Sequence, residues 1–251
     1  MKSRSLVSVA IAFLGACSVV GDEPADDEHE DEYVDPGVQA GDSKMDGNSS
    51  VESVVSSTCS TTPVRGLSMQ IAEEVRCLAP GLLVPFETST SIRFASMAVL
   101  PYLEAETATA LQRAAPAVGT VTVNSGLRSL AQQYLLRRWK EQGRCGIRSA
   151  ALPGRSNHET GRALDLANPS QASKAMSSNG FSPLAGDPVH FDHLASPDLR
   201  DVGVEAFQRL WNRNHPEDLI SEDGSYGPQT AARLARSPSG GFAKSATCTT
   251  P

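Results

Sequence analysis

The sequence predicts an α+β fold in which helices flank a small antiparallel sheet and a helical segment follows at the C-terminal end. Three observations support this prediction. Helical periodicity dominates the first part of the folded region, short alternating segments enclose isolated polar residues in the middle, and two further amphipathic helices follow. The chain has 251 residues, enough for one large domain or two modest ones, and it shows no repeat of fixed period.

Local patterns place the elements in order along the chain. Apolar residues at helical spacing predict a helix over 66–78, and a second helix is expected over 99–115 with Pro101 in its first turn. β-Branched alternation predicts a strand within 119–128. The remaining predicted elements are a helix over 129–143 capped by Ser129, a strand over 161–168, a short helix over 168–180, a strand over 188–194, and helices over 198–214 and 227–237.

The first 17 residues have the features of a secretory signal: two positive charges, an apolar run and then small residues. The apolar run is too short to span a bilayer as a permanent helix. Its end, LGAC, resembles the lipobox of bacterial lipoproteins, which would make Cys17 the lipidated first residue of the mature protein. We therefore expect an exported cell-envelope protein, in the periplasm or on the outer surface, with a lipid anchor on Cys17. The alternative is an ordinary signal peptide cleaved nearby.

An acidic and then Ser/Thr-rich stretch, residues 18–62, is predicted to be a disordered tether. Residues 22–46 hold 11 acids and one lysine, so this segment cannot bury enough apolar surface to order itself. From residue 47 onward the chain has 19 basic and 18 acidic residues and is nearly neutral. A nearly neutral folded part offers no electrostatic footprint for nucleic acid, so we expect no nucleic-acid partner.

The cysteines fit an exported chain. Apart from Cys17 there are four, an even number that suggests two disulfides with three possible connectivities. No two of them are spaced as in a thiolate zinc site. Because Cys59 and Cys248 flank the folded region while Cys77 and Cys145 lie inside it, the nested pairing is the expected one.

Polar residues in the predicted strands suggest a metal site. His158, His190 and His193 lie in one region, and a strand would place His190 and His193 on opposite faces, so at most one of these two joins a site. Asp165 stands in an otherwise apolar strand. Two histidines and one carboxylate around zinc leave a fourth position for water, which is the layout of a catalytic site. Asp187 is then a candidate general base.

Each of these residues also has an ordinary structural interpretation. His158 could be a hydrogen-bonded polar residue, and Asp165 could lie on the exposed face of an amphipathic strand. Asp187 precedes a proline and could initiate a turn. Spacing by itself does not decide between these interpretations and a metal site.

The combined pattern adds a resemblance that is specific in order, residue type and spacing. The stretch SNHETGRALD (156–165), followed by DPVH (187–190), closely resembles the zinc D-alanyl-D-alanine carboxypeptidases and their peptidoglycan-cleaving relatives among the lysostaphin-type and hedgehog-like metallopeptidases. The resemblance implies a small sheet that carries a zinc ion, with Asp187 as general base. The residues that it implies as zinc ligands are His158, Asp165 and His190.

Two further residues follow from the same resemblance. The stretch NSGLRSLAQQ (124–133) is similar to the family's Ser-x-x-Arg-Ser segment, which implies that Arg128 lies over the scissile carbonyl and stabilises the developing oxyanion. Ser156 would lie near the substrate. Many carboxypeptidases carry Glu and Trp where this chain has Asp187 and Val189. The overall resemblance makes removal of the terminal D-alanine from stem peptides the first expectation, and these two departures make cleavage between L-alanine and D-glutamate by an endopeptidase a close alternative.

The region 204–234 resembles the second part of the small helical peptidoglycan-binding repeats, although a helical cap on the catalytic domain would explain it equally. The expected organisation is a peptidase domain over 63–197, a wall-binding-like segment over 198–238 and a tail over 239–251. Peptidoglycan is the expected partner, and we expect a monomer. A lipoprotein that binds the wall through a vestigial zinc site, without catalysis, is the alternative from a different functional class.

Overall fold

The computed structural model describes residues 48–248 and confirms the α+β class. The predicted signal sequence, Cys17 and the acidic part of the tether lie outside the described residues. The helices are α1 (Val51–Ser57), η1 (Thr62–Val64), α2 (Arg65–Leu78), α3 (Ala105–Val118), α4 (Leu130–Glu141), η2 (Asn157–Thr160), α5 (Pro169–Ser177), α6 (Arg200–Asn214) and α7 (Pro228–Arg236). The strands are β1 (Leu83–Pro85), β2 (Ile92–Phe94), β3 (Tyr102–Glu104), β4 (Val121–Ser125), β5 (Ala163–Leu166), β6 (Ser182–Leu184) and β7 (Asp187–Asp192).

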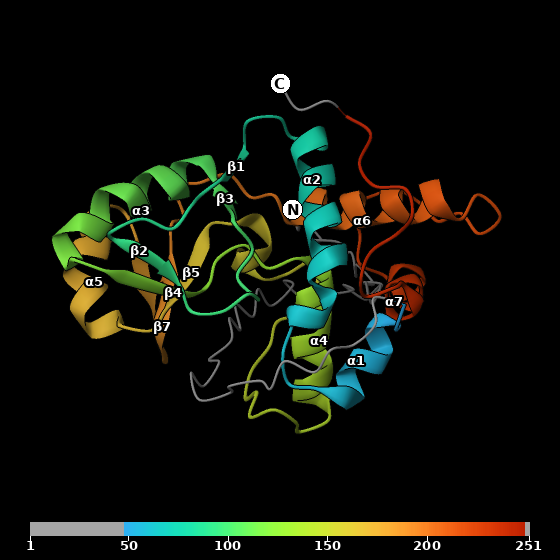
Figure 1. Ribbon diagram of the computed structural model, residues 1–251, viewed down its shortest axis with the longest axis horizontal. Coiled ribbons are helices and arrows are strands. Elements are labelled where there is room, and N and C mark those ends of the chain that lie inside the picture. Colours follow the sequence, from blue (N-terminus) through green and yellow to red (C-terminus); the bar gives the residue numbers. More distant parts are fainter. Residues whose placement is uncertain (1–47, 249–251) are drawn as a thin grey trace, which may run out of the picture.

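Five strands form one sheet in the order β2-β4-β5-β7-β6, and β1 pairs with β3 in a separate two-stranded sheet. The five-stranded sheet is antiparallel apart from its β2–β4 pair, which is parallel. The predicted antiparallel arrangement therefore holds around β5 and β7, whereas β2 departs from it. Helices α3 and α5 lie together beside this sheet, and α1, α2, α4, α6 and α7 gather on the other side of the molecule (Figure 1).

Two hydrophobic clusters follow this division. One lies between the sheet and its two helices, and it includes Leu164, Leu166 and Phe191. The other joins the remaining helices, where Trp139, Phe207 and neighbouring aliphatic side chains are buried. Because side chains alternate along a strand, burial of Leu164 and Leu166 toward α3 and α5 turns the intervening residue of β5 toward the helical side. The polar residues of the sheet thus lie on the face opposite α3 and α5, toward the remaining helices.

The start of α4 is fixed by its sequence. Ser129 is the N-cap, as predicted, and forms a capping box with Gln132: the Ser129 hydroxyl accepts from the Gln132 amide at 3.2 Å and the Gln132 side chain accepts from the Ser129 amide at 3.1 Å. Gln132 also donates to the carbonyl of Ala98 at 2.9 Å. The cap therefore holds the turn between β4 and α4, including Arg128, in a defined position.

The predicted helix over 99–115 is wrong in its first part. Tyr102–Glu104 form a strand that pairs with β1, and the carbonyl of Pro101 accepts a hydrogen bond from Phe86. The helix begins at Ala105 because the buried carboxylate of Glu104 caps it. This carboxylate accepts hydrogen bonds from the backbone amides of Glu106 at 2.8 Å and Thr107 at 3.1 Å. A capping carboxylate and a strand ladder thus outweigh the helical periodicity of the preceding residues.

The predicted tether is also wrong at its C-terminal end. Ser50 caps a short helix, α1, whose valines at positions 51, 54 and 55 are buried against α4 and α7. The serine-rich composition obscured this apolar face, which has the i, i+3, i+4 spacing of a helix. The folded part therefore begins before residue 62.

Two disulfides form, as expected, but the nested pairing is wrong. Cys59 pairs with Cys145, and Cys77 pairs with Cys248, with Cα–Cα distances of 5.3 and 5.6 Å. The reason is helix packing. Cys59 follows α1, which packs beside α4, and Cys145 comes just after α4. The second disulfide attaches the C-terminal end of the described chain to the end of α2.

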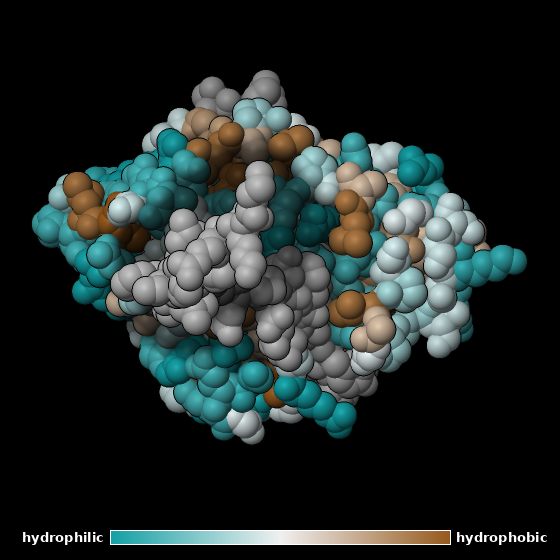
Figure 2. All heavy atoms as spheres, turned by 180° about the vertical axis from the view of Figure 1, so that it is seen from behind, coloured by the Kyte–Doolittle hydropathy of each residue, from teal (hydrophilic) through white to brown (hydrophobic). Residues whose placement is uncertain are grey.

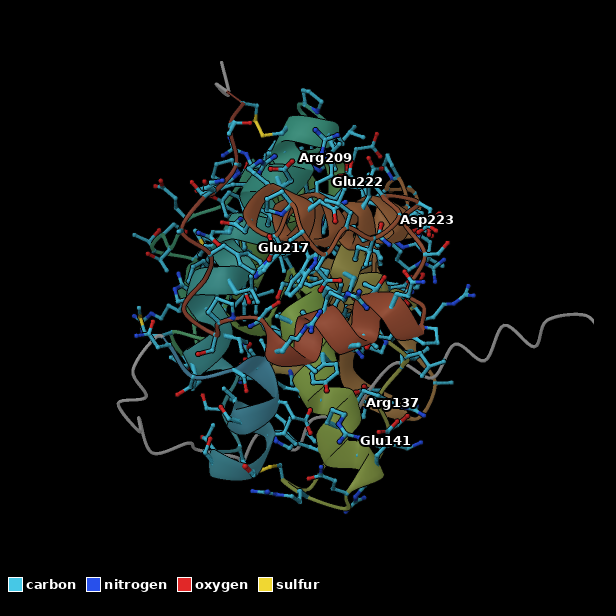
Figure 3. All side chains as sticks on the ribbon, turned by 90° about the vertical axis from the view of Figure 1, so that its right-hand side faces the viewer. Arg137, Glu141, Arg209, Glu217, Glu222 and Asp223 are labelled. Carbon is cyan, nitrogen blue, oxygen red and sulfur yellow. A yellow bond between two sulfur atoms is a disulfide. The ribbon has the colours of Figure 1, made fainter. Side chains whose placement is uncertain are left out.

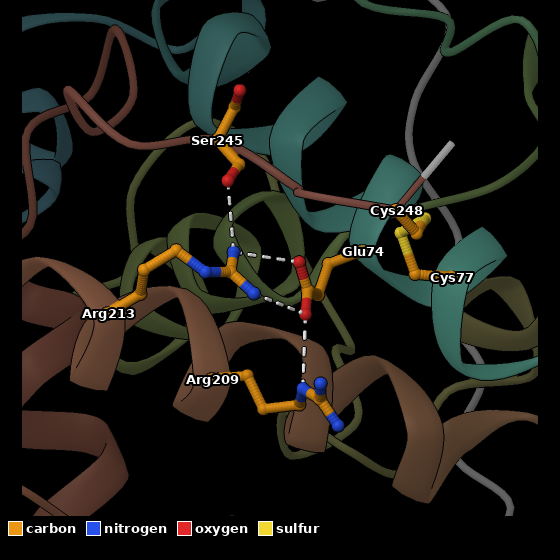
Figure 4. Close-up of a disulfide and its surroundings, with 6 residues drawn as sticks. All are labelled: Glu74, Cys77, Arg209, Arg213, Ser245 and Cys248. Atoms are coloured by element: carbon orange, nitrogen blue, oxygen red, sulfur yellow. Dashed lines mark hydrogen bonds and ion pairs between the residues drawn. A yellow bond between two sulfur atoms is a disulfide. The ribbon is translucent and has the colours of Figure 1, made fainter. Parts of the chain in front are cut away.

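The C-terminal helices are part of the same helical layer. Helix α6 packs along α2, and the buried Glu74 of α2 accepts from Arg213 at 2.9 Å and from Arg209 at 3.1 Å (Figure 4). Arg213 also donates to the carbonyl of Ser245 at 3.0 Å, next to the Cys77–Cys248 disulfide. Residues 198–238 therefore share the core of the helical layer.

The described surface is mixed in character. Charged residues of both signs are interspersed over α4, α6 and the loop after α6, including the Arg137–Glu141 ion pair (Figure 3). The hydrophobic groups in Figure 2 form separate patches among hydrophilic residues. The large exposed hydrophobic side chains are Leu82, Met97, Leu152, Leu194 and Leu219. None of the helices between residues 48 and 248 has the length and apolar character needed to cross a membrane.

Candidate metal centre

Strand pairing brings an aspartate and a histidine together. Asp165 of β5 and His190 of β7 are direct partners in the antiparallel ladder. Their neighbours Leu164 and Phe191 face the cluster below α3 and α5, so alternation turns both polar side chains to the opposite face of the sheet. The expected alternation of β5, with Asp165 on one side and the leucines on the other, is confirmed. His193 lies beyond the end of β7 and takes no part; its Nδ1 is 2.8 Å from the hydroxyl of Ser196.

A short 3-10 helix delivers the second histidine. Ser156 is the N-cap of η2, and its hydroxyl accepts from the amide of His158 at 3.3 Å. Glu159 completes a capping box by accepting from the Ser156 amide at 3.2 Å. Gly161 ends η2 at φ 73°, and a Cβ there would lie 2.7 Å from the amide nitrogen of Glu104. Only glycine fits this turn, which leads directly from His158 into β5.

The three side chains form a compact triangle of possible ligand atoms. His158 Nε2 is 3.2 Å from His190 Nδ1 and 3.3 Å from Asp165 Oδ1, and the remaining edge, from His190 Nδ1 to Asp165 Oδ1, is 3.2 Å. Zinc at 2.0–2.1 Å from tetrahedral ligands requires ligand atoms roughly 3.3 Å apart. Within residues 48–248, these three are the His, Cys, Asp or Glu side chains whose ligand atoms lie close enough together to hold a metal ion. The donor set and its spacing therefore fit zinc.

The other nitrogen of each imidazole is occupied by a protein group. His158 Nδ1 lies 2.9 Å from the carbonyl oxygen of Gly126, and His190 Nε2 lies 3.0 Å from Asp192 Oδ1. Both partners are acceptors, so with a metal ion bound each of these nitrogens would carry the proton and the other nitrogen of the ring would face the ion. Metal-bound histidines generally have such partners. Asp192 was missed from the sequence, although its position two residues after His190 on the same strand face could have identified it.

Arg128 lies at the edge of the triangle. Its guanidinium donates to Asp165 Oδ2 at 3.3 Å, to the hydroxyl of Ser125 at 3.3 Å and to Gln133 Oε1 at 3.0 Å. The side chain is buried, as are the two histidines and Asp165. The structure thus brings Arg128 to the candidate site and orients it through Gln133, a residue that the sequence did not single out.

Asp187 lies beside the same group. Its carboxylate interacts electrostatically with Asp165 and His190, and its Oδ1 accepts from the amide of Val189 at 3.2 Å. The other oxygen, Oδ2, is buried and has no hydrogen-bond partner within the described part of the chain. An unsatisfied buried carboxylate oxygen is costly, which fits a site that accommodates a further polar group. Burial and the negative charge of Asp165 raise the pKa of Asp187 to about 6.

The charges of the triangle are strongly coupled without a metal. Burial, together with the positive charge of Arg128, lowers the pKa of His158. Burial opposes a charged ring at His190 as well, but hydrogen bonds with Asp165 and Asp192 outweigh it and raise the pKa of this histidine to about 10. Burial works against the Asp165 carboxylate too, yet the two histidines lower its pKa below the usual range. A divalent cation bound between these side chains would take the place of the proton that His190 otherwise shares with Asp165.

The sequence comparisons agree with this geometry. Residues 101–188 match the family model of VanY, described as D-alanyl-D-alanine carboxypeptidase. The matched region contains Arg128, Ser156, His158, Asp165 and Asp187, and His190 lies two residues beyond its end. No protein of curated function and no solved structure matches the chain.

The match confirms the resemblance that the motifs suggested. The matched region is similar to the D-alanyl-D-alanine carboxypeptidase family, and this similarity supports a peptidoglycan-acting, carboxypeptidase-like peptidase. The match does not extend to residues 198–238, so the resemblance of that segment to a peptidoglycan-binding repeat stays a prediction.

Proposed function

We propose that the protein is a zinc peptidase that hydrolyses peptidoglycan stem peptides, and that it removes the terminal D-alanine. The observation that supports this most strongly is the triangle of His158 Nε2, Asp165 Oδ1 and His190 Nδ1, with edges of 3.2–3.3 Å. Two of its corners lie in the region similar to carboxypeptidases, and His190 follows two residues after its end. These three residues would hold the ion. Bound zinc would polarise the scissile carbonyl and lower the pKa of a water at the open fourth position.

The residues around the triangle have separate tasks in this proposal. Asp187 takes the proton of the attacking water and passes it to the leaving amine, because its buried Oδ2 has no other hydrogen-bond partner among the described residues. Arg128 stabilises the negative charge that develops on the carbonyl oxygen. Its contact with Gln133 at 3.0 Å keeps the guanidinium in place while substrate binds. Ser156, whose buried hydroxyl caps the turn before His158, would lie near the substrate.

The bond that is cut is tested with defined muropeptides. Digestion of a pentapeptide stem ending in D-alanyl-D-alanine should release free D-alanine and leave a tetrapeptide, as followed by liquid chromatography and mass spectrometry. Internal cleavage alone would reject this specificity. Asp187→Asn, purified in the same way, serves as the control for contaminating peptidases, and Asp201→Asn serves as a control for loss of an exposed carboxylate.

One observation favours the endopeptidase alternative. The candidate base is an aspartate, Asp187, and the residue just before His190 is Val189. Relatives that cut inside the stem peptide also use an aspartate as base. A valine there removes an aromatic wall from the substrate pocket. Cleavage between L-alanine and D-glutamate, without release of D-alanine, is the result that would support this activity. Binding to sacculi without any turnover, unchanged in Asp187→Asn, would instead support a non-catalytic wall-binding lipoprotein.

We further propose that the protein is exported and held at the cell envelope by a lipid on Cys17. Two disulfides support an oxidising compartment, since such bonds are rare in the cytosol. Metabolic labelling with palmitate should mark the wild-type chain and not Cys17→Ser. Wall binding by residues 198–238 is a separate proposal, tested by cosedimentation of the metal-free protein with purified sacculi. Monomeric behaviour is checked by light scattering.

A further inference from the structure

His190 is connected to the surface through a series of buried polar side chains. Its Nε2 lies 3.0 Å from Asp192 Oδ1, and the same oxygen accepts from Asn157 Nδ2 at 3.1 Å. Asn157 Oδ1 in turn accepts from Arg162, from Nε at 3.1 Å and from the terminal nitrogen at 2.6 Å. When His190 carries a proton on Nε2, each donor in this series meets an acceptor.

The series continues into the C-terminal segment. The guanidinium of Arg162 is 3.6 Å from Asp198 Oδ2, and Asp198 forms a two-pronged ion pair with Arg200, the first residue of α6. Arg200 also donates to the carbonyl of Arg155 at 3.0 Å. This carbonyl belongs to the residue just before Ser156, at the entrance to η2. The start of α6 is thereby tied both to the sheet and to the turn that carries His158.

Packing reinforces this link. Helix α6 lies against η2, and a Cβ added at Gly154 would meet Val204 of α6 at 3.1 Å. Glu159 accepts from the amide of Gly154 at 2.9 Å, which closes the turn from inside. The metal triangle is therefore connected to α6 in two ways. One connection consists of hydrogen bonds and the Arg162–Asp198 ion pair, and the other is the close contact of the backbone at Gly154 with Val204.

We propose that these polar side chains act as a positioning chain that holds the His190 ring with Nδ1 in the triangle. Metal affinity then depends on the position of the start of α6 relative to the sheet and η2. The positioning chain consists of Asp192, Asn157, Arg162 and Asp198. The inference rests on the proposed metal site and deepens it. None of its members contacts the ion or the substrate; they act through His190. The C-terminal helices then complete the centre even without binding the wall.

Zinc affinity tests the proposal directly. The metal-free protein is titrated with zinc against a competing chelator, and Co²⁺ is added in parallel because its visible spectrum reports ligand geometry. Asp192→Ala should weaken zinc binding by roughly 10- to 100-fold and alter the Co²⁺ spectrum. Asp192→Asn keeps an acceptor for the ring and should recover part of the affinity. Unchanged affinity and spectrum in a folded Asp192→Ala variant would overturn the proposal.

A double-mutant cycle tests whether the members act in series. Asn157→Ala and Arg162→Gln should each weaken zinc binding, and the double variant should be no weaker than Asn157→Ala alone, because Arg162 acts through Asn157. Asp198→Asn should have a smaller effect in the same direction. Its matched control is Asp201→Asn, an exposed carboxylate three residues further on, in the first turn of α6. Additive effects, or equal effects of the two aspartate variants, would contradict a chain.

The proposal can fail separately from the proposed function. If folded wild-type protein binds no zinc, the peptidase assignment fails, and nuclear magnetic resonance of the metal-free protein then decides the positioning role. A slowly exchanging Nε2 proton on His190 is expected in the wild type and in Asp201→Asn, and its loss in Asp192→Ala and weakening in Arg162→Gln support the chain. A Nε2 proton that exchanges equally fast in all of them would overturn it.

Discussion

Asp165 and His190 face each other as direct partners on β5 and β7, and their side chains approach to 3.2 Å. Two candidate metal ligands are thus spaced by the hydrogen-bond ladder of the sheet itself. A slip of one residue in either strand would turn the ligand of that strand into the hydrophobic cluster beneath α3 and α5. Since burial of the neighbouring leucines and Phe191 forbids such a slip, the fold preorganises half of the site before any ion binds.

Asp187→Asn should remove the base and leave the metal site intact. The amide cannot accept the proton of the attacking water, so we expect kcat/KM on the preferred muropeptide to fall by roughly 10²- to 10⁴-fold. Bound zinc, measured by elemental analysis, should stay at the wild-type level. A fall in both activity and zinc content would mean that Asp187 helps to hold the ion instead.

The activity should decline on the acidic side as Asp187 becomes protonated. Burial and Asp165 raise its pKa from 3.8 to about 6 in the metal-free protein, and a bound cation would lower it again. The carboxylate form is the active one, so kcat/KM should fall as pH drops through a value between 3.8 and about 6. Asp187→Glu should keep this limb, and Asp187→Asn should lose it. Zinc content is measured at each pH, because loss of metal would mimic the effect.

Removing the arginines from the ion-pair group of Figure 4 should destabilise the packing of α2 and α6 more than removing the charge of Glu74. Glu74 is 1% exposed, whereas Arg209 and Arg213 keep partial contact with water. The double variant Arg209→Ala/Arg213→Ala leaves a buried carboxylate without its charge partners and should cost about 3–5 kcal/mol of unfolding free energy. Glu74→Gln leaves arginines that can hydrate and should cost about 1–2 kcal/mol.

Urea unfolding checks this order. Arg137→Ala breaks the more exposed pair with Glu141 (Figure 3) and is the control, expected to change the free energy of unfolding by less than about 1 kcal/mol. A Glu74→Gln variant that is less stable than the double arginine variant would contradict the asymmetry.

The disulfide pairing is open to a direct chemical check. Peptide mapping of the unreduced protein should recover Cys59 linked to Cys145 and Cys77 linked to Cys248. Replacing Cys77 and Cys248 together by serine opens the larger loop, and we expect a loss of roughly 2–5 kcal/mol. Recovery of a Cys59–Cys248 peptide would contradict the arrangement of α1 beside α4.

Strand alternation indicated from the sequence alone that Asp165 stands on the polar side of its strand, but it did not select a set of ligands. The resemblance to the carboxypeptidases implied His158, Asp165 and His190 together, and the structure brings these three side chains into one group. The helix over 129–143 was equally accessible, since its N-cap Ser129 is a local feature, and it is found over Leu130–Glu141.

Tertiary contacts decided the features that local patterns missed. The strand at Tyr102–Glu104 exists because it pairs with β1, and the short strands β2 and β6 have too few residues to show alternation. The cysteine pairing depends on which helices lie side by side, information that order along the chain does not contain. Asn157 and Arg162 become relevant only once η2 and β7 are placed together.

The most direct test of the central claim is the zinc content of folded protein lacking residues 1–46, compared with that of Asp165→Asn. Asp165 contributes one corner of the triangle, and the amide is a much weaker ligand for zinc than the carboxylate. We expect one zinc ion per chain in the wild type and its loss in Asp165→Asn, with both proteins folded. Folded wild-type protein that stays free of metal after zinc is supplied would contradict it.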